Sequence, residues 1–297
     1  MAPRLPAIVA ASALALGCGR PPPASTTTPP PRVELTYLGV AGFELTTGAH
    51  TLLVDPYFSR LAVESDEATI MPDLQAIARH APAHADVILV EHSHYDHLLD
   101  VPFIATKTGA TVIGTESTRN VLRAAGVPTE KIIVARGGET LKVGPFEVRA
   151  IPGLHSLIGK PSTEIPADVK LPMSAAGYAE GGTLQYLVAV EGRTILFVGS
   201  ANFLEGELTG LRPDVAVIAT GLREKIPDYS CRLMRALGNP KLVLADHFDA
   251  LWEPLGPKQM DVGDEARASL SRFVGEIHRC SPATEVAIPV HLQPRAI

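Results

Sequence analysis

Several features of common protein classes are missing from this sequence. Its 297 residues carry 26 Lys and Arg against 32 Asp and Glu, a formal net charge of −6, with no block of basic residues. Proteins that bind nucleic acid usually show a basic stripe, so the sequence argues against a nucleic-acid partner. The apolar run at residues 7–16 is too short to span a bilayer, which needs about 20 apolar residues. Neither repeats nor a Pro/Ser/Gly-rich linker interrupt residues 33–297, so a single domain is expected there.

The N-terminus is typical of an export signal. The stretch "MAPRLPAIVAASALALGC" has a basic Arg4, a short apolar core, and Gly17 before Cys18, which predicts a signal peptide over residues 1–17. Cys18 after Gly17 resembles a bacterial lipoprotein cleavage box, in which the cysteine becomes lipidated. The alternative is an ordinary signal peptide that happens to contain a cysteine. Residues 18–32 are rich in Pro and Thr and are expected to form an extended linker.

Cysteine is scarce, and two residues of this type remain besides Cys18. Cys231 is predicted on one helix, and Cys280 just after another. An exported protein could pair them in a disulfide. Two buried free thiols are an equally good prediction, because free cysteine is often buried.

The pattern of apolar residues predicts an α/β fold with two mixed sheets. Residues 33–55 read as three strand-like runs, with a hairpin turn in "TTGAH". A second hairpin is expected to turn at Glu191 and Gly192. Elsewhere strands alternate with helices, as in "DVAVIAT", "DYSCRLMRALG" and "KLVLADH". A purely parallel sheet would not begin with hairpins, so two mixed sheets with helices outside fit better.

The stretch "ILVEHSHYDHLLD" predicts a metal site. His92, His94, Asp96 and His97 follow a buried apolar strand, and a loop at a strand end can turn several short side chains toward one point. Imidazole nitrogen and carboxylate oxygen are ligands that suit Zn²⁺, Mn²⁺ or Fe. The alternative is a solvated polar loop. It is disfavoured because His155 and His247 also end strand-like runs. The other histidines lack partners at useful spacing and are interpreted as surface or structural: His50, His80, His84, His278 and His291.

Residues 33–297 resemble the metallo-β-lactamase superfamily of metal-dependent hydrolases. The resemblance rests on "TLLVDPYFS" with Asp55, on "EHSHYDHL", on "PGLHS" and on "ADH". The opening "LTYLGVAGFEL" is similar to that of ascorbate-phosphate lactonases and N-acyl phosphatidylethanolamine phospholipases D. The resemblance implies a four-layer αββα sandwich with the site at one edge.

The resemblance also implies a role for each site residue. One or two metal ions, Zn²⁺ first, would activate a water that attacks a carbonyl or phosphorus, and Asp96 would orient that water. Asp55 would hydrogen-bond a ligand or a loop amide; a turn residue before Pro56 is the equal alternative. The expected metal ligands are His92, His94 and His155 at the first position, and Asp96, His97 and His247 at the second.

The sequence departs from the family at the fourth motif. That motif reads Gly-Asp in the family, and its Asp bridges the two metals, whereas this chain has Gly199 and Ser200. A serine hydroxyl is a poor ligand for a hard dication, and the amide oxygen of Asn202 would be a weak one. Weaker or single metal occupancy is therefore expected. The departure also keeps a second hypothesis open, in which the chain is a non-catalytic metal- or ligand-binding envelope protein on the same fold.

The long Pro/Gly-rich segment 156–182 is expected to form a wall or lid over the site, because loops of this length are uncommon unless functional or disordered. For Trp252, close after His247, core packing is favoured over a place in the pocket. The sequence thus predicts an exported, lipid-anchored hydrolase at a bacterial cell envelope, or else a periplasmic or secreted one. Its substrate would be a small or lipid-like ester, lactone, amide or phosphodiester, and the membrane would be reached only through the lipid anchor. Nothing in the sequence defines the oligomeric state.

Overall fold

The computed structural model describes residues 1–2, 32–256 and 262–297. The chain divides into Met1–Pro30 and Pro31–Ile297, and the fold described below lies in the second unit. Residues 3–17 of the predicted signal peptide, Cys18 and all of the predicted linker except Arg32 lie outside the described residues. Within the described ranges, no helix is long and apolar enough to cross a membrane.

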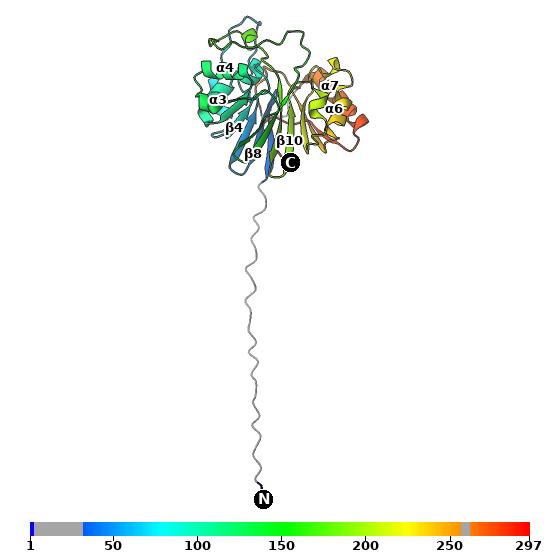
Figure 1. Cartoon of the computed structure of the whole chain (residues 1–297). Helices are drawn as coiled ribbons and strands as arrows, with labels where there is room; N and C mark the ends of the chain where they lie inside the picture. The colour runs from blue at the N-terminus through cyan, green and yellow to red at the C-terminus, as the bar shows by residue number, and fades with distance from the viewer. Residues whose placement is uncertain (3–31, 257–261) are drawn as a thin grey trace. The chain divides into compact units, whose positions relative to one another are not determined.

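Two seven-stranded mixed sheets pack face to face (Figure 1). The strands of the first sheet are, in spatial order, β14 (Pro294–Ala296), β1 (Val33–Gly39), β2 (Gly42–Thr47), β3 (His50–Val54), β4 (Val87–Leu89), β5 (Thr111–Gly114) and β6 (Ile132–Val134). Those of the second are β13 (Glu285–Ala287), β12 (Leu242–Asp246), β11 (Val215–Ala219), β10 (Arg193–Val198), β9 (Leu184–Val190), β8 (Phe146–Pro152) and β7 (Thr140–Val143).

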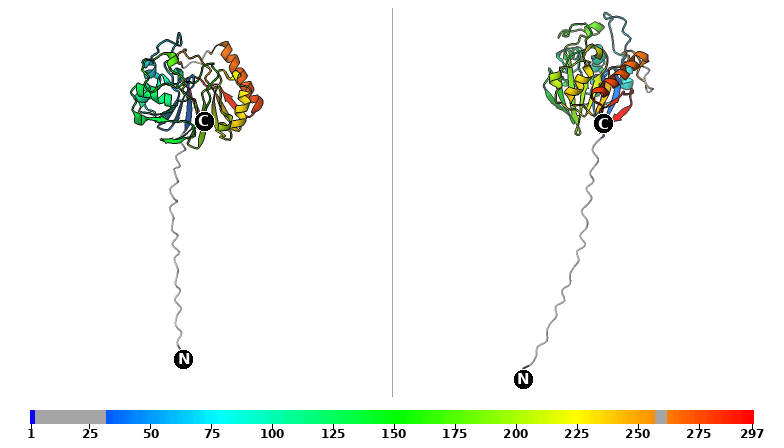
Figure 2. Two further views of the ribbon diagram at one scale, coloured as in Figure 1. Left: turned by 45° about the horizontal axis from the view of Figure 1, so that its top comes forward. Right: turned by 90° about the vertical axis from the view of Figure 1, so that its right-hand side faces the viewer.

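Helices cover the outer face of each sheet, and the two helical layers lie on opposite sides of the sandwich (Figures 1 and 2). The helices over the first sheet are α1 (Leu74–His80), α2 (Tyr95–Leu98), α3 (Val101–Thr108) and α4 (Glu116–Ala124). Those over the second are α5 (Glu205–Leu208), α6 (Tyr229–Leu237) and α7 (Gly263–Cys280). The short 3₁₀ turns in the described part of the chain are η1 (Thr129–Lys131), η2 (Ala175–Gly177) and η3 (Arg223–Lys225). The four-layer αββα fold expected from the sequence is confirmed.

Three apolar cores hold these layers together. The central core fills the space between the sheets, where the rings of Phe43 and Phe197 face each other with centroids 6.1 Å apart. Alternate residues of the strands enter this core or one of the two helix-facing cores, as the two-residue period of a strand requires. Burial of both faces explains why strands such as β11 read as continuous apolar runs.

Local sequence signals explain several element boundaries. The hairpin between β9 and β10 turns at Glu191 and Gly192, both at positive φ, 48° and 74°, which matches the turn that the twist of paired strands favours. The stretch "HLLDVPFIATKTG" has helical spacing throughout, but the structure divides it between the end of α2 and α3. Pro102 lies in the first turn of α3, where its missing N–H costs no hydrogen bond. The short elements α5 and β14 carry no such signal and are absent from the sequence interpretation.

Candidate metal centre

The predicted ligands converge at one end of the sandwich, because they all follow strands that point the same way. Asp55 follows β3, and the segment from His92 to His97 follows β4, in the first sheet. His155, Ser200 and His247 follow β8, β10 and β12 in the second sheet. Both sheets therefore contribute side chains to a single pocket, of about 210 Å³.

His92, His94 and His155 form the first cluster. One ligand nitrogen from each lies within 4.8 Å of the others. The ring of His92 lies 4.6 Å from that of His155 and 4.8 Å from that of His94, between centroids. Neither ring nitrogen of His92 has a hydrogen-bond partner although the residue is buried. An orphaned imidazole is costly in a core, so this arrangement fits a cation ligand.

Asp96, His97 and His247 form the second cluster, again with ligand atoms within 4.8 Å of one another. Asp96 Oδ2 lies 3.3 Å from His247 Nε2 and 3.5 Å from His97 Nε2. Desolvation opposes the protonation of His247, but the hydrogen bond and charge of Asp96 outweigh it and raise the pKa of His247 to about 9. A cation bound here must displace that proton, so binding releases protons.

The remaining imidazoles are neutral at neutral pH and have lone pairs available for a metal. Burial lowers the pKa of His97 to about 4, against the opposing charge of Asp96. Burial, reinforced by the neighbouring histidines, also lowers the pKa of His92 well below its ordinary value. The donor set is thus imidazole nitrogen with one carboxylate, which fits Zn²⁺, Mn²⁺ or Fe.

Asp55 orients the second cluster from behind. Its Oδ2 lies 2.7 Å from His97 Nδ1, and its Oδ1 accepts the Glu91 N–H at 2.9 Å. With Nδ1 engaged, His97 directs its unpartnered Nε2 toward the cluster. Asp55 and His247 have positive φ, 41° and 49°, a conformation that is uncommon outside glycine and gathers at functional sites.

Ser200 lines the pocket, whereas the side chain of Asn202 forms hydrogen bonds with backbone groups. The amide of Asn202 donates to the His155 carbonyl at 3.1 Å, and its oxygen accepts the Phe203 N–H at 3.0 Å. Asn202 therefore fixes the loop that carries His155. Next to Ser200, the N–H of Gly199 donates to the buried carboxyl of Glu91 at 3.0 Å.

Asp249 fixes the loop that carries His247. It accepts from Val40 N at 2.8 Å and from Arg60 at 2.7 Å, and lies 2.8 Å from His291 Nε2. Sequence reasoning missed Asp249 and Glu91; the one available signal was that each lies within two residues of a predicted ligand. His291 is buried and structural as predicted.

The other four histidines outside the predicted site belong to neither cluster. His50 and His84 lie near Asp86 at 3.2 Å and 3.6 Å. His80 stacks on Phe58 with ring centroids 6.0 Å apart, and His278 is exposed.

A second chamber, of about 340 Å³, adjoins the metal pocket. Four residues line both: His94, Asp96, Ile158 and Leu251. The segment 156–182 supplies most of the chamber's wall, in agreement with its expected place beside the site. Trp252 is 58% exposed and lines neither space, so the favoured prediction of core packing was wrong, and its neighbour Leu251 faces the pocket instead.

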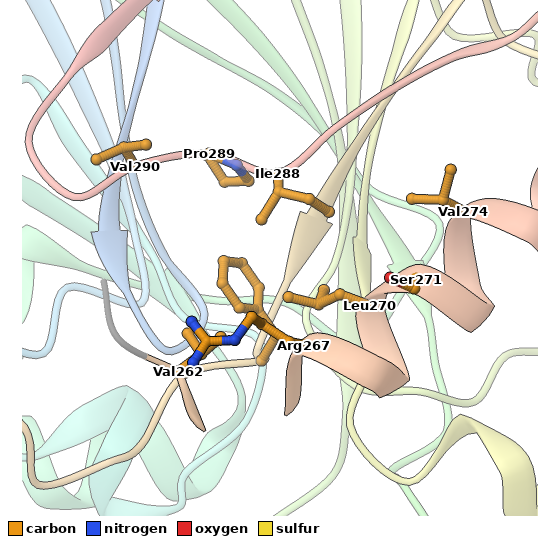
Figure 3. A pocket seen from close by; sticks show the side chains of 9 residues that line it. Val262, Arg267, Leu270, Ser271, Val274, Ile288, Pro289 and Val290 are labelled. Carbon is orange, nitrogen blue, oxygen red and sulfur yellow. The ribbon is translucent and has the colours of Figure 1, made fainter. Parts of the chain in front are cut away.

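Another hollow has a different character. It lies between α7 and residues 288–290 (Figure 3) and holds none of the predicted ligands. Apolar side chains such as Leu270 and Ile288 dominate its lining, and Arg267 is the charged residue among them. Chemistry-bearing side chains thus gather at the strand-end pocket and not in this hollow.

Known proteins of similar sequence and fold identify the class. The family described as beta-lactamase superfamily domain matches residues 50–229, and the chain belongs to this superfamily. A UPF0173 metal-dependent hydrolase of Rubrobacter xylanophilus is 31% identical over 257 residues, which cover 85% of this chain and 96% of that protein. Another, of Methanopyrus kandleri, is 27% identical over 221 residues, 73% of this chain and 84% of that one. The protein is accordingly a metal-dependent hydrolase.

Solved structures share the fold at low sequence identity. Igni18, a metallo hydrolase of Ignicoccus hospitalis, superposes with a TM-score of 0.60 at 16% identity, covering 89% of this chain and 98% of that one. An isothiocyanate hydrolase from Delia radicum gut bacteria gives 0.54 at 16% identity, covering 89% and 99%. The finer resemblance to lactonases and phospholipases stays a prediction.

Proposed function

We propose that this hydrolase cleaves a small, uncharged ester or lactone with an apolar acyl part. The observation that carries the proposal is the chamber beside the metal pocket. Among the described residues that line it, Lys160 is the one cation, and Lys160 forms an ion pair with Asp66. Apart from the metal ligand Asp96, the lining also contains Glu180, so a phosphodiester would meet more negative than positive side chains in the chamber, which disfavours it.

The apolar part of the lining supports the same substrate class. Ile158 and Leu251 stand where the chamber meets the metal pocket, because both line each space. Tyr178 also faces the chamber, and burial raises the pKa of its phenol well above the ordinary value. A neutral phenol of this kind can donate a hydrogen bond to an uncharged carbonyl or ring oxygen.

The residues of the pocket would have separate roles in such a reaction: binding metal, orienting water and positioning the substrate. His92, His94 and His155 would hold one Zn²⁺ ion, and Asp96, His97 and His247 a second; Mn²⁺ or Fe would suit the same donors. When bound, the ions polarise the scissile carbonyl and make water nucleophilic at neutral pH. Asp96 faces both spaces and is placed to orient the attacking water. Ile158 and Leu251 position the acyl part and exclude bulk water.

A substrate panel tests the proposal. Protein loaded with Zn²⁺ is assayed on p-nitrophenyl esters of two to eight carbons, on γ- and δ-lactones, and on bis-p-nitrophenyl phosphate. We expect kcat/KM for an ester or lactone to exceed that for the phosphodiester by at least about 100-fold, roughly 3 kcal/mol of transition-state stabilisation. The highest kcat/KM on the phosphodiester would reverse the assignment.

A neighbouring pair of variants provides a matched control. Leu251→Ala removes a side chain that lines both spaces, whereas Trp252→Ala removes an exposed neighbour that lines neither. KM for the longer esters should rise about tenfold in the first variant and stay unchanged in the second, because only the first loses apolar contact with the acyl chain. Equal effects would contradict the placement of the acyl part.

Ser200 favours a second candidate, a non-catalytic metal- or ligand-binding protein on the same fold. That candidate predicts metal binding without turnover of any ester, lactone, amide or phosphodiester. Metal content measured on the protein used for the panel separates the two. Bound metal without activity supports the binder, and absence of metal after gentle dialysis together with no activity rejects the metal-dependent reading of the site.

Export and lipid attachment at Cys18 belong to the same proposal, and place the enzyme at a cell envelope. The support is the charged start, short apolar core and Gly17–Cys18 junction of the sequence. A Cys18→Ser variant should still be exported but should partition into the soluble fraction. Its retention in membranes would count against the lipid anchor.

A further inference from the structure

Glu180 is a half-buried acid in the wall of the chamber beside the metal pocket. Two other carboxylates belong to the same lining, and each of them already has a partner or a role. Asp96 is part of the second cluster, and Asp66 forms an ion pair with Lys160. Glu180 is in neither metal cluster. In the described lining, Glu180 is therefore the carboxylate that is left for a substrate.

The backbone around Glu180 is held in place from two sides. Its carbonyl accepts the N–H of Ser93 at 2.8 Å, and Ser93 lies between two ligands of the first cluster. The next residue, Gly181, has a φ of 68° and donates to the Thr163 carbonyl at 2.9 Å. A Cβ built on Gly181 would lie 2.2 Å from the Cβ of Ser117, so glycine is needed for the chain to pass here. The position of Glu180 is thus fixed relative to the metal ligands.

The carboxylate of Glu180 has one oxygen engaged and the other available. Thr183 Oγ1 donates to Oε1 at 2.7 Å, and in the described part of the chain Oε2 has no hydrogen-bond or ion-pair partner. Burial lowers the pKa of His155, and the negative charge of Glu180 is the strongest influence that opposes this shift. Glu180 therefore lies at the metal side of the chamber, where His94 also lines the wall.

We infer that Glu180 selects substrates whose acyl part carries a hydroxyl group on the carbon α or β to the scissile carbonyl. A carboxylate only accepts hydrogen bonds, so its partner on the substrate must be a donor. A neutral hydroxyl fits better than an ammonium, because metal ions in the adjoining pocket would repel another cation. The place of Glu180 at the metal side of the chamber puts this donor close to the carbonyl.

The inference rests on the proposed function and narrows its substrate to a hydroxylated ester or lactone. The rest of the acyl part stays apolar, because Ile158 and Leu251 line the passage between chamber and pocket. A substrate without the hydroxyl would take water away from Glu180 and give no hydrogen bond in return, which lowers its kcat/KM.

Matched p-nitrophenyl esters test the inference on the Zn²⁺-loaded protein. The esters are those of butyrate, α-hydroxybutyrate, β-hydroxybutyrate and β-aminobutyrate, and each kcat/KM is divided by the rate of spontaneous hydrolysis in the same buffer. We expect one of the hydroxy esters to exceed butyrate by at least about tenfold. Absence of any preference for a hydroxy ester, or the highest value on the amino ester, would overturn the inference.

Glu180→Gln tests whether this residue causes the preference. The amide oxygen can keep the hydrogen bond from Thr183, but the amide group then turns a donor toward the substrate and offers no acceptor. We expect kcat/KM to fall about tenfold for the preferred hydroxy ester and less than about twofold for butyrate. A merely structural role would lower both values equally, and that result would contradict the inference.

Thr183→Val is a second variant, which keeps the carboxylate and removes the hydroxyl that orients it. It should reduce the preference for the hydroxy ester without abolishing it. An unchanged preference in both Glu180→Gln and Thr183→Val would reject the role of Glu180, and Thr183→Val alone decides the matter if Glu180→Gln does not fold.

Glu164→Gln is the matched control, because it removes an exposed carboxylate of the same segment that does not line the chamber. It should keep the wild-type preference, and an equal loss in the control would overturn the assignment to Glu180. Turnover of esters without any preference for a hydroxyl rejects this inference and leaves the proposed function standing. No turnover of any ester or lactone by the metal-loaded protein rejects the proposed function itself.

Discussion

The metal pocket and the α6–α7 layer bury polar side chains in opposite ways. In the layer, Arg223 is almost fully buried and its guanidinium donates to Glu276, to Thr220 O and to Ser269. The disulfide between Cys231 and Cys280 then joins the two helices. In the pocket, by contrast, both ring nitrogens of His92 and the Nε2 of His97 are buried without a hydrogen-bond partner.

The difference separates stability from function within one domain. Satisfied polar groups contribute to folding, whereas orphaned ones cost free energy and persist where a ligand completes them. Changes in the pocket should therefore alter metal binding and turnover, and changes in the layer should alter the free energy of unfolding.

The largest effect is expected from His92→Ala. Loss of a ligand from the first cluster should remove one metal ion and lower kcat/KM by about 10³-fold or more, equal to about 4 kcal/mol. The thermal midpoint of metal-free protein should change little, since the imidazole has no hydrogen-bond partner there. Metal analysis, kinetics and calorimetry measure the three quantities. His84→Ala, at an exposed position, is the control, and equal loss of activity in both variants would remove the contrast between site and surface histidines.

Breaking the disulfide should change a free energy by a similar amount, but the change should fall on the stability of the fold and not on activity. Cys231→Ser opens a covalent link that spans 49 residues, which corresponds to about 4 kcal/mol of unfolding free energy. Metal content and kcat/KM of the folded variant should match the wild type. Denaturant unfolding with and without reductant measures the effect. A wild type insensitive to reductant would show that the pair does not stabilise the layer.

Asp55→Asn should have an intermediate effect confined to the pocket. The carboxylate fixes the ring of His97 at 2.7 Å, and loss of such a partner lowers metal affinity by about 10- to 100-fold. Asp86→Asn is the matched control, because Asp86 pairs with His50, a histidine outside the site. Chelator competition measures both variants, and similar affinities in the two would contradict the orienting role of Asp55.

The smallest effect is expected from Glu276→Gln, and it should depend on pH. Partial burial alone would raise the pKa of Glu276, but hydrogen bonds from Arg223 and Ser230 outweigh it and hold the pKa below its usual value. The carboxylate thus stabilises the fold above the ordinary glutamate pKa, and this contribution is lost as pH falls through the lower folded-state pKa. We expect the variant to lose about 1 kcal/mol at pH 7, a figure reduced by solvent screening.

Urea unfolding of wild type and Glu276→Gln at pH 7 and at about pH 3.5 measures the difference between them. The gap should shrink at the lower pH. A gap that grows on acidification would mean that Glu276 does not stabilise the layer as a carboxylate.

The fold and most of the site were predictable because both are local in the sequence. Strand periodicity, hairpin turns and the strand-end histidines each occupy a few consecutive residues. The split between α2 and α3 could have been read from Pro102, whereas β14 could not, since its three residues gain regularity only by pairing with β1.

Other features depend on contacts between distant segments. Cys231 and Cys280 lie 49 positions apart, and the sequence left paired and free thiols equally open. Glu91 and Gly199 meet across the two sheets, and neither residue alone marks the contact. Trp252 is exposed and Leu251 lines the pocket, and both follow Asp249, whose side chain ties this loop to Val40 and Arg60.

The sequence by itself determined which groups can bind metal, since residue type and strand-end position define the donors. Tertiary structure decided which acids face those donors, how the chamber beside them is lined and which cysteines pair. The physical reason is the distance along the chain over which each effect acts. Periodicity and turn chemistry act over a few residues, whereas the partner of a buried polar group can come from any segment that the opposite sheet brings within a few ångströms. Ser200 stands where the family has a carboxylate, and only the hydrogen bond between Gly199 and Glu91 shows which buried acid lies next to that strand end.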